Sequence, residues 1–139
     1  MIPQRINLIV YSTLAVIICY IDRVNISVAI IPMQEQFGWT DSQVGFIFSS
    51  FYLGYMLTMA LGGYLSDKFG GKRVLGWGVV LWSIFTILTP LAAHNGFFAL
   101  FFIRVLMGIG EGVTFPAWHS LYARWIPFNE RTRAIAFTN

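Results

Sequence analysis

Charged residues are scarce in this sequence. Only 11% of its 139 residues are Asp, Glu, Lys or Arg, whereas a soluble domain carries about 25%. Hydrophobic residues make up 57% of the chain, and the mean hydropathy is +0.68. This balance excludes an ordinary soluble domain. It predicts an all-α protein embedded in a lipid bilayer, because a spanning helix satisfies its own backbone hydrogen bonds.

Signals for other classes of protein are also missing. The single cysteine, Cys19, excludes a disulfide within the chain. His94 and His119 belong to no H-E-x-x-H pattern, and no G-x-S-x-G occurs. They are interpreted as a turn residue and an interfacial packing residue. The glycine-rich run at 108–112 follows no strand, so it is not a dinucleotide loop. No enzyme activity, metal site, cofactor or nucleic-acid partner is predicted.

Long apolar runs predict four membrane helices and the start of a fifth. The expected ranges are 7–31, 41–65, 74–92, 97–123 and 134–139 onward, joined by polar loops that include 66–73 and 124–133. Twenty-five residues reach about 37 Å, enough to cross a ~30 Å hydrocarbon core. The first run lacks a small-residue cleavage site, so we expect a retained span rather than a signal peptide. Pro32 and Pro90 are expected to end helices.

The second expected helix carries two local signals. Thr40 and Gln43 match a capping box at its start. Small residues then recur every four positions, which favours close helix packing; they are Ser50, Gly54, Thr58 and Gly62. Tyr52, on the same helix, is a candidate cavity residue, although packing is the commoner role of such a tyrosine.

The basic residues predict an orientation. Seven of the nine Lys and Arg residues lie at the amino end or in the even-numbered loops. The odd-numbered loops contain no Lys or Arg, and their charged residues are Glu35 and Asp41. Because positive loops stay on the cytoplasmic side, the amino terminus and loops 66–73 and 124–133 are predicted to be cytoplasmic. The predicted location is the plasma membrane, of the bacterial inner-membrane type.

Four charges lie inside the predicted spans. Asp22 and Arg23 are about 13 Å from the outer face, and Arg104 and Glu111 are about 10 Å and 21 Å from it. Charges in hydrocarbon are costly unless they pair or line a polar cavity. We therefore expect the first and fourth spans to face a common cavity, with the second and third packed around them. A purely structural ion pair is the alternative.

Residues 63–73 (GYLSDKFGGKR) resemble the loop signature of the major facilitator superfamily, G-x-x-x-D-R/K-x-G-x-R/K-R/K. Gly63 is expected to allow close approach of another backbone, and Gly70 and Gly71 are expected to form the tight turn of the loop. Asp67 is expected to pair with Arg73 or to serve the amino end of another helix. The resemblance implies a conformational latch, which would consist of Gly63, Asp67, Lys68, Gly70, Lys72 and Arg73. An ordinary solvated turn is the alternative.

Four further stretches look like the anion:cation symporter branch of that family, which includes sugar-acid, sialic acid and vesicular glutamate carriers. They are residues 20–25 (YIDRVN), 49–55 (SSFYLGY), 104–116 (RVLMGIGEGVTFP) and 125–131 (WIPFNER). Residues 59–63 (MALGG) depart from the Gln-x-Pro-Gly-Gly of relatives.

The resemblance implies proton-coupled symport of an organic anion. Asp22 and Glu111 match the protonatable acids of the branch, and Arg23 and Arg104 match its anion-handling arginines; Asn25 and Tyr52 complete the candidate substrate site. Arginine suits a carboxylate because its planar guanidinium group donates two parallel hydrogen bonds. We expect Glu111 to pair with Arg104 and to release it on protonation, and Asp22 to do the same with Arg23.

The resemblance also implies a twelve-helix fold of which this chain is the amino-terminal part, so we expect a missing carboxyl-terminal half to supply the facing wall. Two alternatives are a non-transporting membrane scaffold and a complete small homo-oligomeric transporter. The strong charge bias opposes the dual insertion that an antiparallel dimer requires.

Overall fold

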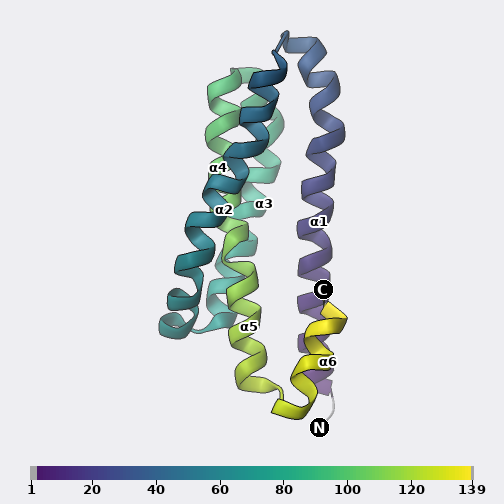
Figure 1. The fold of residues 1–139 in the computed structure, drawn as a ribbon, viewed down its shortest axis with the longest axis vertical. Coiled ribbons are helices and arrows are strands. Elements are labelled where there is room, and N and C mark those ends of the chain that lie inside the picture. Colours follow the sequence, from purple (N-terminus) through teal and green to yellow (C-terminus); the bar gives the residue numbers. More distant parts are fainter. Residues whose placement is uncertain (1–2, 139) are drawn as a thin grey trace.

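The computed structural model describes residues 3–138, and these residues form six α-helices and no strand. The helices are α1 (Pro3–Phe37), α2 (Asp41–Phe69), α3 (Gly71–Asn95), α4 (Phe97–Gly112), α5 (Thr114–Trp125) and α6 (Phe128–Thr138) (Figure 1). Four stretches are long and apolar enough to cross a membrane: Ile6–Phe37, Asp41–Phe69, Gly71–Asn95 and Phe97–Trp125. The predicted all-α membrane fold with four spans is therefore confirmed.

Two prolines that were expected to end helices lie inside them. Pro32 lies within α1, and Pro90 lies within α3. A proline removes one backbone donor, but its fixed φ is compatible with a helix, and neighbouring side chains can compensate in a membrane span. The prediction that the first helix ends at Pro32 was wrong. The third helix continues past Pro90 and ends at Asn95, before Gly96, whose φ is +115°.

The two expected polar loops are short. Residues 66–73 are helical except at Gly70, whose φ of +87° reverses the chain between α2 and α3. Glycine adopts that conformation without the steric cost that other residues bear. The second loop consists of Ile126 and Pro127, because α6 already begins at Phe128. Polar residues of both expected loops thus lie in terminal helical turns.

The fourth span contains a break that the sequence analysis did not predict. α4 ends at Gly112, Val113 forms a turn, and α5 begins at Thr114. Pro116 explains the position of the break, because it has no N–H to donate to the carbonyl of Gly112 and its ring crowds that carbonyl.

α4 packs between α2 and α3, and its contact with α2 is made by small residues. A side chain on Gly54 would collide with the backbone carbonyl of Val105, and one on Gly108 would collide with that of Phe51. Ser50, Gly54, Thr58 and Gly62 are all buried. The predicted ladder of small residues is therefore confirmed, as is the capping box, in which Gln43 N donates to Thr40 Oγ1 at 3.3 Å and Thr40 N donates to Gln43 Oε1 at 2.9 Å.

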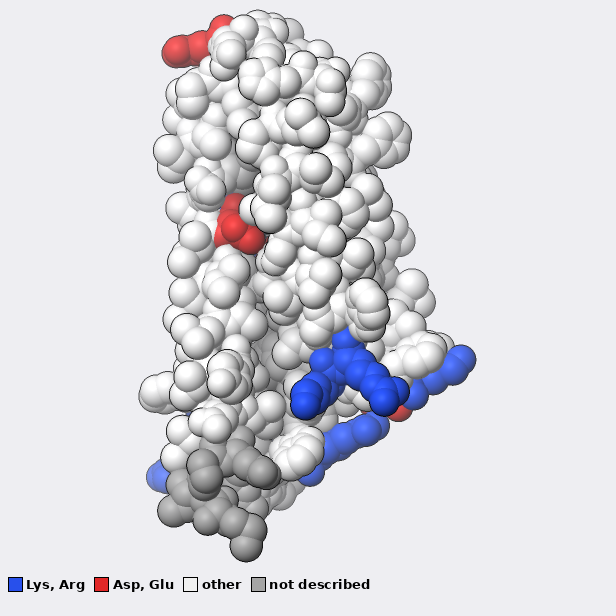
Figure 2. Space-filling view, turned by 180° about the vertical axis from the view of Figure 1, so that it is seen from behind, with Lys and Arg blue, Asp and Glu red and all other residues white. Residues whose placement is uncertain are grey.

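The charges separate along the long axis of the molecule. On the face shown in Figure 2, Lys and Arg gather at one end with a single small acidic patch among them, and further acidic residues appear halfway along and at the opposite end. The basic end holds the junctions between α2 and α3 and between α5 and α6, whose basic residues are Lys68, Lys72, Arg73, Arg124, Arg131 and Arg133. Within the described part of the chain, only Arg23 and Arg104 carry positive charge in the middle of a span.

Candidate functional site

The centre of the site is an ion pair between α1 and α4. Arg23 donates to Glu111 Oε1 from Nε at 2.8 Å, and its Nη2 lies 2.7 Å from the same oxygen. The Glu111 side chain is fully buried, whereas that of Arg23 is 22% exposed. The expectation that Glu111 pairs with Arg104 was wrong. Two helical turns, about 10 Å, separate those residues along α4, whereas α1 brings Arg23 directly against Glu111.

Arg104 is buried without a carboxylate partner. Its Nη1 donates to Met107 Sδ at 3.4 Å, its Nε has no hydrogen-bond partner, and among the residues described it forms no ion pair. A cation in this setting is costly to bury. The Phe51 ring and the Met107 sulfur are the partners that the structure gives this guanidinium group.

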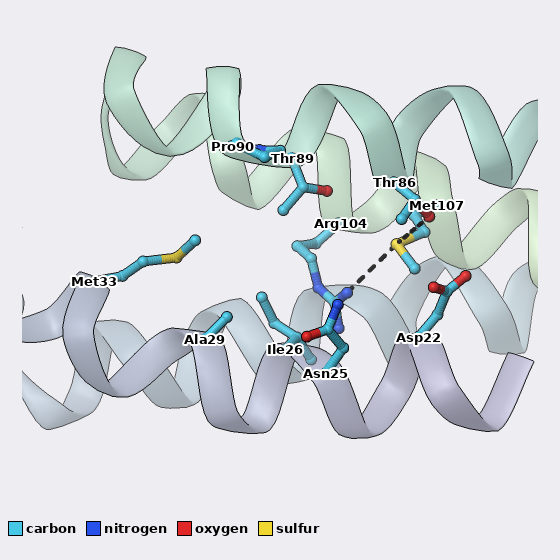
Figure 3. Close-up of a pocket in the computed structure, with 10 residues that line it drawn as sticks. All are labelled: Asp22, Asn25, Ile26, Ala29, Met33, Thr86, Thr89, Pro90, Arg104 and Met107. Carbon is cyan, nitrogen blue, oxygen red and sulfur yellow. Dashed lines mark hydrogen bonds between the residues drawn. The ribbon is translucent and has the colours of Figure 1, made fainter. Parts of the chain in front are cut away.

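Asp22 and Arg104 share a pocket of about 120 Å³. Figure 3 shows Asp22 and Asn25 on α1 facing Thr86 and Thr89 of α3, with the Arg104 side chain between them. The first and fourth spans therefore do line a common pocket, as predicted, but of the four mid-span charges only Asp22 and Arg104 line it. The third span also lines it, which was not predicted, because the sequence of α3 contains no charge inside the bilayer. Asp22 forms no ion pair with its neighbour Arg23 in the described residues, contrary to expectation.

One aromatic ring connects the two arginines. The guanidinium carbon of Arg23 lies 5.4 Å from the ring centroid of Phe51, and that of Arg104 lies 5.0 Å from it. Arg23 also lies 4.8 Å from the ring centroid of Tyr55 and 5.6 Å from that of Tyr20. Rings at these distances stabilise a cation through their negative faces. Phe51 thus forms a common platform for both positive charges.

The sequence analysis missed Phe51 and Tyr55 as site residues. Tyr52, which it proposed, is 54% exposed and is not among the residues that line the pocket of Asp22 and Arg104. The small-residue ladder already contained the missing signal. Phe51 and Tyr55 each directly follow a ladder residue, Ser50 and Gly54, so they border the face that packs on α4.

Two buried oxygen atoms lie near the ion pair without hydrogen bonds. They are Oε2 of Glu111 and Oγ1 of Thr114, and both residues are fully buried. Cys19, also buried, belongs to the apolar cluster of Phe51, Trp82 and Met107 beside them. The Cys19 thiol interacts with both Glu111 and Thr114, and a thiol is only a weak donor.

The candidate latch residues lie at the basic end. Gly63 has open space around it, so the expected close approach there was wrong; Gly62 and Gly71 make the close contacts instead, with Pro116 and with the carbonyl of Ala117. Gly71 is thus a packing residue rather than part of the turn. Asp67 forms no described ion pair with Arg73, but its backbone carbonyl accepts a hydrogen bond from Arg124 Nη2 at 3.4 Å.

Four apolar spans with paired and unpaired charges at mid-depth define a multi-pass membrane protein with a polar internal site. Residues 12–139 match the model of the Major Facilitator Superfamily. The chain belongs to this family, which confirms the resemblance to the superfamily and its fold. Because the family consists of membrane transporters, the prediction that the chain is not an enzyme agrees with it.

Curated relatives resemble almost the whole chain. It is 50% identical to the "Probable anion transporter 4, chloroplastic" of Oryza sativa subsp. japonica over 96% of this chain and 23% of the relative. Two relatives from Arabidopsis thaliana are each 48% identical to it over 96% of this chain. They are the "Ascorbate transporter, chloroplastic", of which the match covers 25%, and the "Sodium-dependent phosphate transport protein 1, chloroplastic", of which it covers 26%. The chain thus spans about a quarter of the length of these relatives.

Proposed function

We propose that this chain forms one wall of the substrate site of a secondary active transporter that moves an anion across a membrane by alternating access. The observation that carries the proposal is the placement of Arg23 and Arg104 against one ring at mid-depth, with a carboxylate bound to only one of them. The names of the relatives support an anion as the substrate. The facing wall would come from a carboxyl-terminal half.

Coupling to protons would act through Glu111. In the arrangement described, Glu111 neutralises Arg23, and Arg104 is open to the pocket. Protonation of Glu111 would break the ion pair, so that Arg23 and Arg104 could bind the anion together. Asp22 would serve as a second proton site beside Arg104, while Asn25 and Tyr52 would contribute polar contacts to the substrate.

The substrate we propose is an organic carboxylate, such as a sugar acid, handled in the manner of the anion:cation symporter branch. A guanidinium group binds a carboxylate through two parallel hydrogen bonds. The relative named as an ascorbate transporter supports an organic anion. Inorganic phosphate with sodium coupling is the second candidate, favoured by the relative named for that activity.

The basic end would remain on the cytoplasmic side of the membrane and would hold the latch. We propose that Asp67, Lys68, Lys72 and Arg73, with the glycines at 63 and 70, contact the other half of the transporter in one of its states. The predicted membrane is a plasma membrane; the names of the relatives favour a chloroplast membrane instead.

The decisive experiment compares driven uptake with exchange in proteoliposomes that contain the natural gene product. Glu111→Gln should abolish accumulation of the anion under an imposed proton gradient while exchange of labelled for unlabelled anion continues. Asp41→Asn, which removes an exposed carboxylate at the outer end, is the matched control and should leave both activities intact. Accumulation by Glu111→Gln that equals the unmodified protein would refute proton coupling through this residue.

The choice of driving ion and substrate can be tested in the same vesicles. Ascorbate or a sugar acid should accumulate with a proton gradient alone, in sodium-free buffer. Uptake of phosphate that requires an inward sodium gradient, with no uptake of the organic acids, would favour the second candidate. A protein with neither activity would support the scaffold alternative.

A further inference from the structure

A groove on the surface of the bundle lies apart from the proposed substrate site, and it shares Arg73 with the candidate latch. It lies between α2 and α3 above the surface of α4 and has a volume of about 330 Å³. Ligand pockets typically span roughly 300–1,000 Å³. Apolar side chains line most of it, among them Leu65, Phe69, Val74, Trp77 and Leu81. Thr58 also borders it, but its hydroxyl already donates to the carbonyl of Gly54 at 2.8 Å.

The depth of the groove follows from helix packing. α2 and α3 both pack more closely on α4 than on each other, so a gap separates them. Gly78 and Gly110, which both border the groove, bring the backbones of α3 and α4 together; a Cβ atom on Gly78 would lie 2.8 Å from the carbonyl oxygen of Gly110. The facing helix fills the space that a side chain on either glycine would take, so the floor of the groove is formed where the two backbones meet.

One end of the groove is positively charged. Arg73 lines it at the basic end of the molecule and forms no ion pair with any residue described. The Lys68 ammonium group lies 5.5 Å from the ring centroid of Phe69, which is part of the groove wall. From Arg73 the groove extends along α3 to Leu81, eight residues or about 12 Å further on. Trp77, on the wall between them, is 70% exposed, as is usual for a tryptophan near a membrane interface.

We propose that this groove binds one anionic phospholipid, with an acyl chain between α2 and α3 and the phosphate on Arg73, assisted by Lys68. Lipid tails surround every membrane span, so an apolar groove alone would not distinguish one lipid from another. Selectivity comes from the phosphate, to which a guanidinium group donates paired hydrogen bonds. Anionic lipids are also the ones that a cytoplasmic leaflet presents to a basic end. The site is independent of the transported anion.

The test uses native mass spectrometry of the purified natural gene product, titrated with palmitoyl-oleoyl phosphatidylglycerol or with the phosphatidylcholine of the same chains. The unmodified protein should bind phosphatidylglycerol more tightly. Arg73→Gln should weaken that binding about fivefold, as expected for the loss of one cation near the membrane surface, and should leave phosphatidylcholine binding unchanged. Lys72→Gln is the matched control, because Lys72 carries the same charge one residue away but lines a different pocket; it should have little effect.

A second variant tests the apolar part of the site and keeps the proposal open to refutation if Arg73→Gln folds poorly. Leu81→Trp adds bulk to the far end of the groove and should weaken the binding of both lipids, with helicity measured by circular dichroism unchanged. Equal binding of the two lipids by the unmodified protein would overturn the proposal. So would equal losses in Arg73→Gln and Lys72→Gln, which would indicate diffuse attraction to the basic end, or phosphatidylglycerol binding that neither Arg73→Gln nor Leu81→Trp affects.

Discussion

At the scale of the residue, the two arginines inside the spans differ in how their charge is balanced. Arg23 has the Glu111 carboxylate at 2.7 Å, whereas Arg104 has a methionine sulfur and an aromatic ring. A buried ion pair tolerates loss of both partners better than loss of one, because a single removal leaves an uncompensated charge. The two arginines should therefore respond differently to mutation.

We predict that Arg23→Gln lowers the free energy of unfolding by about 3 kcal/mol, because it leaves the fully buried Glu111 without a counter-charge. The double variant with Glu111→Gln should recover most of that loss. Thermal unfolding of the single and the double variant in a mild detergent would measure the loss and its recovery. A double variant no more stable than Arg23→Gln alone would mean that the pair contributes no coupling.

At the scale of the element, the contact between α2 and α4 depends on glycines that allow backbones to touch. Gly108 lies against the carbonyl of Phe51, the residue whose ring supports both arginines. The packing of these helices therefore sets the position of the aromatic platform relative to Arg104. A substitution at Gly108 that moves α2 should therefore also move the Phe51 ring relative to Arg104.

We predict that Gly108→Ala destabilises the protein by about 1–3 kcal/mol, because its methyl group would push α2 away from α4. Gly76→Ala is the matched control, since nothing lies within 4 Å of the position a Cβ would take. It should be neutral or stabilising by up to about 1 kcal/mol, given the helix preference of alanine. Chemical or thermal unfolding of both variants tests this; equal effects would contradict the packing described.

At the scale of the whole molecule, the separation of charge predicts how the chain is inserted. Basic residues occupy one end, and Glu35 and Asp41 lie at the other, where α1 meets α2 (Figures 1 and 2). An insertion that follows the positive-inside rule places the basic end in the cytoplasm or an equivalent compartment.

We predict that single cysteines introduced at exposed, uncharged positions report opposite sides of the membrane. In a Cys19→Ser background, Gln36→Cys should react with a membrane-impermeant maleimide added outside intact cells, and Asn129→Cys should react only after the membrane is opened. Because both substitutions replace uncharged residues, they leave the distribution of Lys and Arg between the two ends unchanged. Labelling of both positions from outside would indicate dual insertion and revive the small homo-oligomeric alternative.

The sequence by itself determined the class of the protein, its four spans, the charge bias and the four charged residues inside the spans. These follow from local properties: an apolar run must be helical in a bilayer, and a charge within it must be compensated. It also identified the capping box and the ladder of Ser50, Gly54, Thr58 and Gly62, because both are patterns within a single helix.

Only the tertiary structure decided which charges pair. The spacing along α4 predicted an ion pair between Arg104 and Glu111, but the packing of α1 places Arg23 against the Glu111 carboxylate instead. The tertiary structure also placed Phe51 and Tyr55 beside the arginines, and it brought α3, which has no charge inside the bilayer, to the pocket. The physical reason is that partners on different helices are chosen by how the helices pack and rotate, and no spacing within one helix contains that information.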